Sequence, residues 1–170
     1  MKARDIDEAV GKMTVIVDTR EQDTVALRNR LQHLGAAYVR HSLSVGDYSA
    51  RYTLGAAETE YLLPVAIERK MSLDELAACF TSERARFERE MERAKDLGTR
   101  MYLLIEGGSW EKVYGGKYQS RIIPAALGGS LLAWMARYDL RIVFCRTETT
   151  GRLIGDILRH ELVEVLKNHD

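Results

Sequence analysis

The chain has 170 residues, of which 46% are hydrophobic and 29% are charged, a composition typical of one soluble globular domain. Its 25 basic residues balance its 25 acidic residues, so overall charge does not favour strong non-specific binding to DNA, although a local basic groove is still compatible. No signal-peptide core and no apolar run near the roughly 20 residues of a membrane span occur, so we expect a cytoplasmic protein without membrane contact. Cys79 and Cys145 lack metal-binding spacing and are expected to be buried, reduced thiols.

The elements follow from hydrophobic periodicity along the chain. Residues 1–13 are polar and show no clear period, so we expect a loose lead-in. Two features mark helix starts: Ser72 with Glu75 three residues later forms a capping box, and Ser120 is a candidate cap with Pro124 in the following turn. The pattern predicts six strands: residues 15–17, a strand that starts at 38, 48–54, 61–67, 101–105 and 140–145. The strands over 48–54 and 61–67 are expected to form a hairpin that turns at 55–57. The predicted helices are residues 27–34, a helix that starts at 72, 83–97, 120–134 and 153–166.

This alternation of strands and helices predicts an α/β fold with a mixed sheet flanked by helices on both sides. We see no internal repeat and no convincing linker, so residues 14–170 are expected to form a single domain.

The most informative residues lie at the end of an apolar run, residues 62–67, that we predict to be a buried strand. Because side chains alternate along a strand, Glu68 and Lys70 should point the same way and Arg69 the opposite way. A further carboxylate, Asp47, directly follows Gly46. Two carboxylates and an ammonium group suit metal-assisted hydrolysis of a phosphodiester.

Another group of charged residues follows the first predicted strand. Asp18, Arg20 and Glu21 stand at its exit, where ligands and catalytic groups are common in open α/β sheets. The alternative is structural: Asp18 caps the next turn, and Arg20 and Glu21 form a surface pair. On their own, these residues favour the structural alternative.

Four blocks together resemble the nuclease domain of the XPF family of structure-specific endonucleases, which has the PD-(D/E)xK restriction-endonuclease-like fold. They are residues 17–21 (VDTRE), 45–48 (VGDY), 68–74 (ERKMSLD) and 103–107 (LLIEG). The resemblance runs from about Thr14 to the last helix and is greatest to short, nuclease-only bacterial or phage relatives.

The resemblance implies a role for each matching residue. Asp47 and Glu68 would bind Mg²⁺ or Mn²⁺ together with the backbone carbonyl of Arg69, and Lys70 would orient the attacking water and stabilise charge on the phosphate. The resemblance also makes Asp18 and Glu21 further catalytic acids of the pocket, which would hold the metal through water or a second cation, with Asp18 among the metal residues. Arg20 and Arg69 would pair with these acids or touch DNA, Asp74 would tie its helix to the pocket, and Arg84 would contact DNA.

Around Arg84 the chain departs from the family pattern, because Glu83 and Glu88 replace the usual glycine and glutamine. In this predicted helix, Phe87, Met91 and Ala94 fall on one face, and the interleaved charges favour ion pairs within the helix over contacts with phosphates. Many relatives also carry a tandem helix-hairpin-helix module, which this sequence lacks, so we expect a separate protein to supply specificity. The resemblance implies DNA as the partner, DNA repair as the setting, and a homodimer. The apolar residues within 127–134 and 153–166 predict that the dimer forms through the two C-terminal helices; the alternative is that both helices only cover the sheet. Two alternatives stay open: a non-catalytic DNA-binding or scaffolding module of this fold, and an unrelated hydrolase of small phosphoesters.

Overall fold

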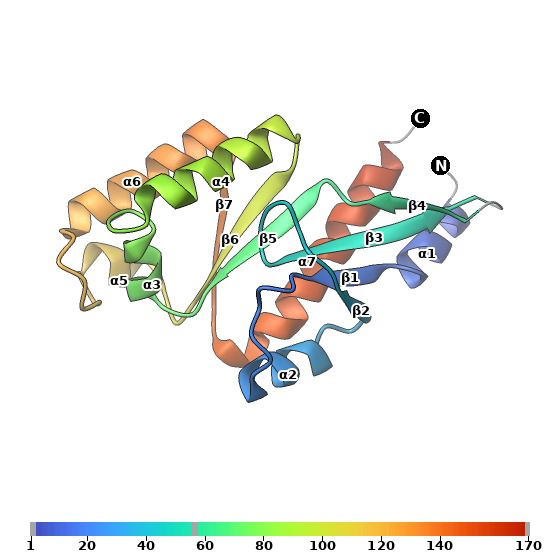
Figure 1. The fold of residues 1–170 in the computed structure, drawn as a ribbon, viewed down its shortest axis with the longest axis horizontal. Helices are drawn as coiled ribbons and strands as arrows, with labels where there is room; N and C mark the ends of the chain where they lie inside the picture. The colour runs from blue at the N-terminus through green and yellow to red at the C-terminus, as the bar shows by residue number, and fades with distance from the viewer. Residues whose placement is uncertain (1–2, 56–57, 169–170) are drawn as a thin grey trace. The chain divides into compact units, whose positions relative to one another are not determined.

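A computed structural model describes residues 3–55 and 58–168 (Figure 1). The helices are α1 (Ala3–Gly11), α2 (Val25–Gln32), α3 (Leu73–Ala78), α4 (Arg84–Asp96), α5 (Trp110–Tyr114), α6 (Pro124–Tyr138) and α7 (Thr147–Lys167). The strands are β1 (Thr14–Val17), β2 (Ala37–Arg40), β3 (Tyr48–Leu54), β4 (Thr59–Leu62), β5 (Val65–Lys70), β6 (Arg100–Glu106) and β7 (Arg141–Cys145).

The strands form a seven-stranded sheet in the order β2-β1-β3-β5-β6-β7, with β4 paired to β3. The sheet is mixed, as predicted: β1 pairs parallel with β2 and β6 with β7, whereas β3 pairs antiparallel with β1 and β4. The chain divides into two compact units, which we call unit 1 (residues up to 66 and from 148 on) and unit 2 (residues 67–147). Strand β5 begins in unit 1 and ends in unit 2.

Unit 1 contains an unusually close contact between α7 and the end of α2. A Cβ atom at Gly155 would lie 1.9 Å from the backbone oxygen of Leu34, and one at Gly151 would lie 2.2 Å from that of Arg30. The two glycines are four residues apart and therefore lie on one face of α7. Only glycine lets the two backbones approach this closely, because any side chain would collide with backbone rather than with a movable group.

Unit 2 is held by aromatic packing between its helices. Phe87 lies on the inward face of α4, as its helical spacing predicted, and stacks on Trp134 of α6 at 5.1 Å between ring centroids. Two polar contacts join the same helices: Arg137 bonds to Glu88 at 3.2 Å and the Tyr138 hydroxyl donates to Glu92 at 2.7 Å. The pair of Glu88 is therefore between helices, where the sequence favoured pairs within α4.

Several helix starts differ from the prediction. Helix α7 begins at Thr147, six residues before the predicted start at 153. Residues 3–11, expected to be a loose lead-in, form α1 with Ile6 and Ala9 buried, and with so few inward residues the apolar period was too weak to detect. Helix α6 is capped at Ile123 without a side-chain bond, so Ser120 is not its cap. The cap of α3 is confirmed: the Ser72 hydroxyl accepts from the Glu75 N–H at 3.1 Å.

Strand boundaries also needed correction. The predicted strand over 61–67 is interrupted after β4, at Leu63 and Pro64, before β5 begins, and a proline has no N–H with which to continue a ladder. The hairpin of β3 and β4 is confirmed, while positions 56 and 57 of its predicted turn lie outside the described residues. Helix α5 was not predicted. Whether residues 14–170 act as one domain stays a prediction.

Among the described helices, none is long and apolar enough to cross a membrane. Cys79 is a buried free thiol, as predicted, and burial raises its pKa to about 11. Cys145 is also a free thiol but is only half-buried, so that part of the prediction was wrong.

Candidate functional site

The predicted site residues fall in both compact units. Unit 1 holds Asp18, Arg20, Glu21 and Asp47, and unit 2 holds Glu68, Arg69, Lys70, Asp74 and Arg84.

Asp18 lies just past β1 and is only 1% exposed. One carboxylate oxygen accepts bonds from the backbone N–H and Nε of Arg20, each at 2.7 Å, and the other accepts from the Leu43 N–H at 2.6 Å and Arg20 Nη2 at 3.2 Å. Burial alone would raise the pKa of Asp18, but these hydrogen bonds outweigh it and lower the pKa below its usual value. Both oxygens are therefore engaged in fixing the loop after β1, and metal binding by Asp18 stays a prediction.

The loop that carries Asp47 is tied to the same place in unit 1. The Asp18 N–H donates to the Asp47 carbonyl at 2.8 Å, and Arg20 Nη2 donates to the Gly46 carbonyl at 3.4 Å. Gly46 has a φ of +73°, a conformation that residues with a Cβ rarely adopt. Gly46 thus turns the chain sharply into β3 and leaves Asp47, half-buried, at the start of that strand.

Glu21 is held by two residues that were not among the predicted site residues. Arg30 of α2, only 7% exposed, donates to the Glu21 carboxylate at 3.0 Å and to the Tyr48 hydroxyl at 2.7 Å, and that hydroxyl donates to the same Glu21 oxygen at 2.9 Å. Burial raises the pKa of Tyr48, so its hydroxyl stays protonated and available as a donor. These bonds join Arg30 and Tyr48, which are buried, to Glu21, which is half-buried, and they fix the Glu21 carboxylate.

In unit 2, Glu68 and Lys70 meet as their strand positions predicted. Lys70 Nζ donates to the Glu68 carboxylate at 2.6 Å, and the two residues are 5% and 7% exposed. A buried acid and a buried base in direct contact neutralise each other, which makes their burial tolerable.

Arg69 alternates to the other side of β5, and its guanidinium pairs with Glu106 of β6 at 3.3 Å. Glu106 is 5% exposed and also accepts from the Thr147 hydroxyl at 3.3 Å. Glu106 belongs to the matching block 103–107, but no role was predicted for it. Its contacts show that it anchors the side chain of Arg69.

Asp74 and Arg84, the remaining predicted residues, differ in surroundings. One carboxylate oxygen of Asp74 accepts from the N–H groups of Gln119 at 2.7 Å and Ser120 at 2.8 Å, so Asp74 ties the first turn of α3 to the segment before α6. Arg84 is the first residue of α4 and is exposed to solvent.

The ERCC4 domain family matches residues 17–157, which is most of the chain. The chain belongs to this family. The match confirms the resemblance to the XPF family that the four sequence blocks indicated.

Two solved structures share the fold of this ERCC4 domain. XPF from Aeropyrum pernix is 21% identical with a TM-score of 0.61, and the match covers 86% of this chain and 65% of that one. The same protein in complex with DNA is 20% identical with a TM-score of 0.58, covering 91% of this chain and 64% of that one. The chain thus spans just under two thirds of these relatives. No curated protein sequence matches it.

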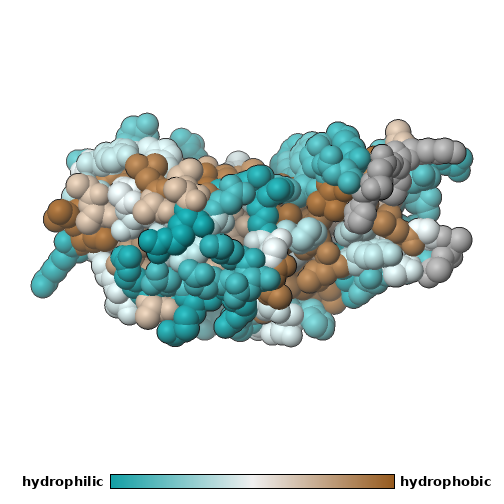
Figure 2. Space-filling model, turned by 90° about the horizontal axis from the view of Figure 1, so that it is seen from above, coloured by the Kyte–Doolittle hydropathy of each residue, from teal (hydrophilic) through white to brown (hydrophobic). Residues whose placement is uncertain are grey.

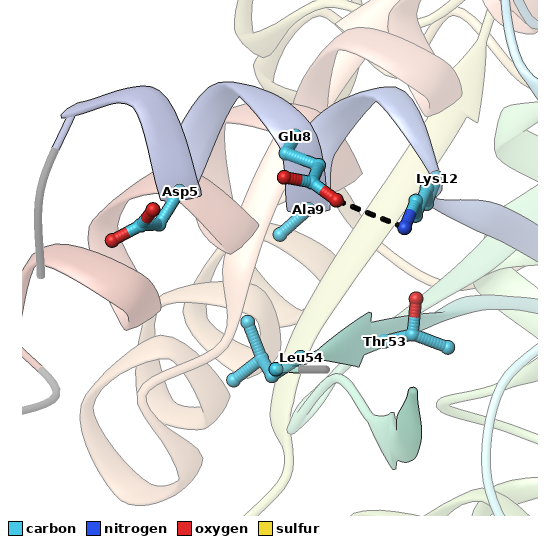
Figure 3. A pocket seen from close by; sticks show the side chains of 7 residues that line it. Asp5, Glu8, Ala9, Lys12, Thr53 and Leu54 are labelled. Atoms are coloured by element: carbon cyan, nitrogen blue, oxygen red, sulfur yellow. Dashed lines mark hydrogen bonds and ion pairs between the residues drawn. The ribbon is translucent and has the colours of Figure 1, made fainter. Parts of the chain in front are cut away.

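A pocket of about 430 Å³ lies between α1 and the end of β3, where Asp5, Glu8 and Lys12 lie opposite Thr53 and Leu54 (Figure 3). None of the predicted site residues lines this pocket.

The described residues contain no group of three or more His, Cys, Asp or Glu side chains placed to hold a metal ion. This does not conflict with the predicted cofactor, because Mg²⁺ keeps several waters and is usually bound through one or two carboxylates. The candidate donors, the Asp47 and Glu68 carboxylates and the Arg69 carbonyl, are the oxygen ligands that Mg²⁺ and Mn²⁺ prefer.

Proposed function

We propose that this ERCC4 domain is a metal-dependent endonuclease that hydrolyses phosphodiester bonds in DNA. The observation that carries the proposal is the buried contact of 2.6 Å between Glu68 and Lys70 within the ERK segment of β5. Membership of the ERCC4 domain family supports it, as does the shared fold with an XPF protein that has been solved in complex with DNA.

In this proposal Asp47 and Glu68 bind Mg²⁺ or Mn²⁺, with the Arg69 carbonyl as a further ligand. The bound ion would polarise the scissile phosphate and lower the pKa of a coordinated water. Lys70 supplies a fixed positive charge and N–H donors that orient the water and stabilise the negative charge growing on the phosphate. The family resemblance implies products with a 5′-phosphate and a 3′-hydroxyl.

The residues of unit 1 then have a supporting task. Asp18 and Arg20 fix the Gly46–Asp47 backbone through the bonds described above, and Arg30 and Tyr48 fix Glu21. We propose that Asp18 and Glu21 act mainly by holding this loop in position. In unit 2, Asp74 steadies α3, and exposed Arg84 is the proposed contact with the DNA backbone.

A cleavage panel of single-stranded, duplex, flap, fork and four-way DNA, each with Mg²⁺ and with Mn²⁺, tests the proposal. We expect the wild-type protein to cut at least one substrate, and Asp47→Ala and Glu68→Gln each to lower the rate by on the order of 10²–10³ while the circular dichroism spectrum is unchanged. Glu60→Gln is the control, since Glu60 is an exposed residue of β4. Wild-type rates in both site variants would reject the assignment.

A non-catalytic DNA-binding or scaffolding module is the second candidate. It is favoured by the pairing of Glu68 with Lys70, which already neutralises the acid without a cation. Calorimetry with Mg²⁺ separates the two candidates: an enzyme should bind the ion, with the affinity lost in Asp47→Ala, whereas a scaffold should give no heat. Turnover of a mononucleotide ester without cleavage of DNA would instead indicate a small-phosphoester hydrolase.

We also propose that the protein forms a homodimer, with α6 alone as the contact surface. The apolar residues of α7 that suggested it are buried within unit 1, and Leu127, Leu131 and Trp134 of α6 are buried within unit 2. Hydrophobic residues nevertheless reach the surface among hydrophilic ones (Figure 2). Four exposed residues of α6 lie on one face of the helix, and none of them is charged: Ala125, Gly129, Leu132 and Ala136.

Light scattering at rising concentration tests this dimer. Leu132→Glu should shift the equilibrium to monomer, and a wild-type monomer at high concentration would reject it. A separate specificity protein, a role in DNA repair and a cytoplasmic location stay predictions.

A further inference from the structure

The ammonium group of Lys70 lies over the face of an aromatic ring. Its Nζ is 5.3 Å from the centroid of Phe87, within the distance of about 6 Å at which a cation is attracted to the electron-rich face of a ring. Lys70 is 5% exposed and Phe87 is 2% exposed, so little water screens the attraction. Lys70 is thus held between a carboxylate, Glu68, and a ring.

Phe87 is itself fixed by its neighbours. It stacks on Trp134 at 5.1 Å with 24° between the ring planes, and meets Phe80 edge-on at 6.2 Å. Its helix presents Phe87, Met91 and Ala94 to the interior as one buried face. The ring therefore cannot turn away from Lys70 without disturbing the packing of α4 against α6.

The chemistry of the contact suits a residue that positions a charge. A lysine side chain has four rotatable bonds and samples many rotamers unless something restrains it. A ring face attracts the whole ammonium charge, whereas a second carboxylate would compete with phosphate for its N–H groups. Phe87 can therefore restrain Lys70 and leave its positive charge available to a substrate.

We propose that Phe87 is a positioning residue for Lys70, acting through the contact of its ring face with the ammonium group. The inference rests on the proposed nuclease function, in which Lys70 acts on the scissile phosphate. It assigns a part in catalysis to a buried apolar residue of α4 that would otherwise be read as core.

Phe80 is the matched control. It belongs to the same cluster, is similarly buried at 4% and meets Trp134 at 4.9 Å. Among the contacts of the described residues, a cation lies over Phe87 and none lies over Phe80. A purely structural role would make the two positions respond alike.

The experiment replaces each phenylalanine in turn with mono-, di- and trifluorophenylalanine, which progressively weaken the negative ring face with little change in size. At position 87 we expect kcat for DNA cleavage to fall stepwise, to about a tenth of wild type with the trifluoro ring, while KM changes less than about twofold. At position 80 kcat should change less than about twofold. Equal responses at the two positions, or a constant kcat at position 87, would overturn the proposal.

A second readout does not depend on activity. Protons above a ring face are shifted upfield in NMR spectra, so the Cε protons of Lys70 should be shifted upfield in the wild type and in Phe80→Leu and return to ordinary values in Phe87→Leu. Unshifted Lys70 protons in the wild type would overturn the contact itself. If the shift is present but no DNA is cut, the proposed function fails and Phe87 is left as a structural partner of Lys70.

Discussion

The acidic motif residues of the two compact units have different binding partners. In unit 1, Asp18 and Glu21 are bound by arginines, Arg20 and Arg30, and by backbone or hydroxyl donors. In unit 2, Glu68 is bound by Lys70, whose ammonium lies on an aromatic ring.

An arginine is always charged and bonds through a rigid planar fork, which suits it to fixing a loop, whereas a lysine is a compact point charge that can interact with a phosphate. Under the proposed function, Asp18 and Glu21 form a structural frame in unit 1, whereas Glu68 and Lys70 are reactive groups in unit 2. Variants that disturb this frame should therefore change stability, and variants of the Glu68–Lys70 pair should change rate.

The largest expected effect is on the frame. Arg30→Met removes the buried guanidinium that donates to the half-buried Glu21 carboxylate and to the Tyr48 hydroxyl, and we expect the free energy of unfolding to fall by about 3 kcal/mol in urea titrations. Arg28→Met, on the same helix, is the control, because its pair with Asp23 is exposed on both sides and should contribute less than about 1 kcal/mol. Equal losses in the two variants would show that Arg30 stabilises the fold no more than an exposed ion pair does.

The next prediction concerns the proposed role of Lys70 in cleavage. We expect Lys70→Ala to lower the cleavage rate on the order of a hundredfold while DNA binding, measured by fluorescence anisotropy, changes only a few-fold. Lys70→Gln keeps a donor for Glu68 and should retain the fold but not the rate. Lys95→Ala, at the end of α4, is the control for a lost surface charge. A Lys70→Gln protein that cuts at the wild-type rate would contradict the role of the ammonium.

A third test concerns the backbone contact in unit 1. Gly155→Ala forces a Cβ against the Leu34 carbonyl, and we expect thermal denaturation to show a loss of about 1–3 kcal/mol. Gly129→Ala in α6 meets nothing within 4 Å and should stabilise the helix by about 0.5–1 kcal/mol. A neutral Gly155→Ala would mean that α7 can move away from α2 without loss.

The smallest effect is on acid stability. Because the folded pKa of Asp18 lies below its unfolded value of about 3.9, its ionised form stabilises the fold above that pH, and the contribution is lost as pH falls through the folded pKa. Asp18→Asn should be less stable than wild type at pH 7 and should lose stability less steeply between about pH 5 and pH 2. Asp23→Asn is the exposed control. An unchanged slope in Asp18→Asn would show that other carboxylates govern acid unfolding.

Much of the secondary structure could be predicted from local sequence patterns. Hydrophobic periodicity located β1, β6 and α4, and strand alternation placed Glu68 and Lys70 on the same side, because these features depend on neighbours in sequence. Arg30 was missed because a buried arginine and a surface arginine look alike until Glu21 and Tyr48, from other segments, are placed around it.

The contact between Phe87 and Lys70 was missed for a similar reason. Spacing showed that Phe87 faces inward but not which group its ring would meet. Gly151 and Gly155 did leave a signal, since two glycines four apart on a helix indicate a close neighbour.

The neutral pair of Glu68 and Lys70 has a practical consequence. An acid buried alone would need a cation before its strand could form, but here the ammonium already balances the charge within the chain. We therefore expect β5 to assemble without divalent ions. Under the proposed function, the protein kept in EDTA would be a folded, inactive stock, and adding Mg²⁺ would start DNA cleavage at a defined moment without a refolding step.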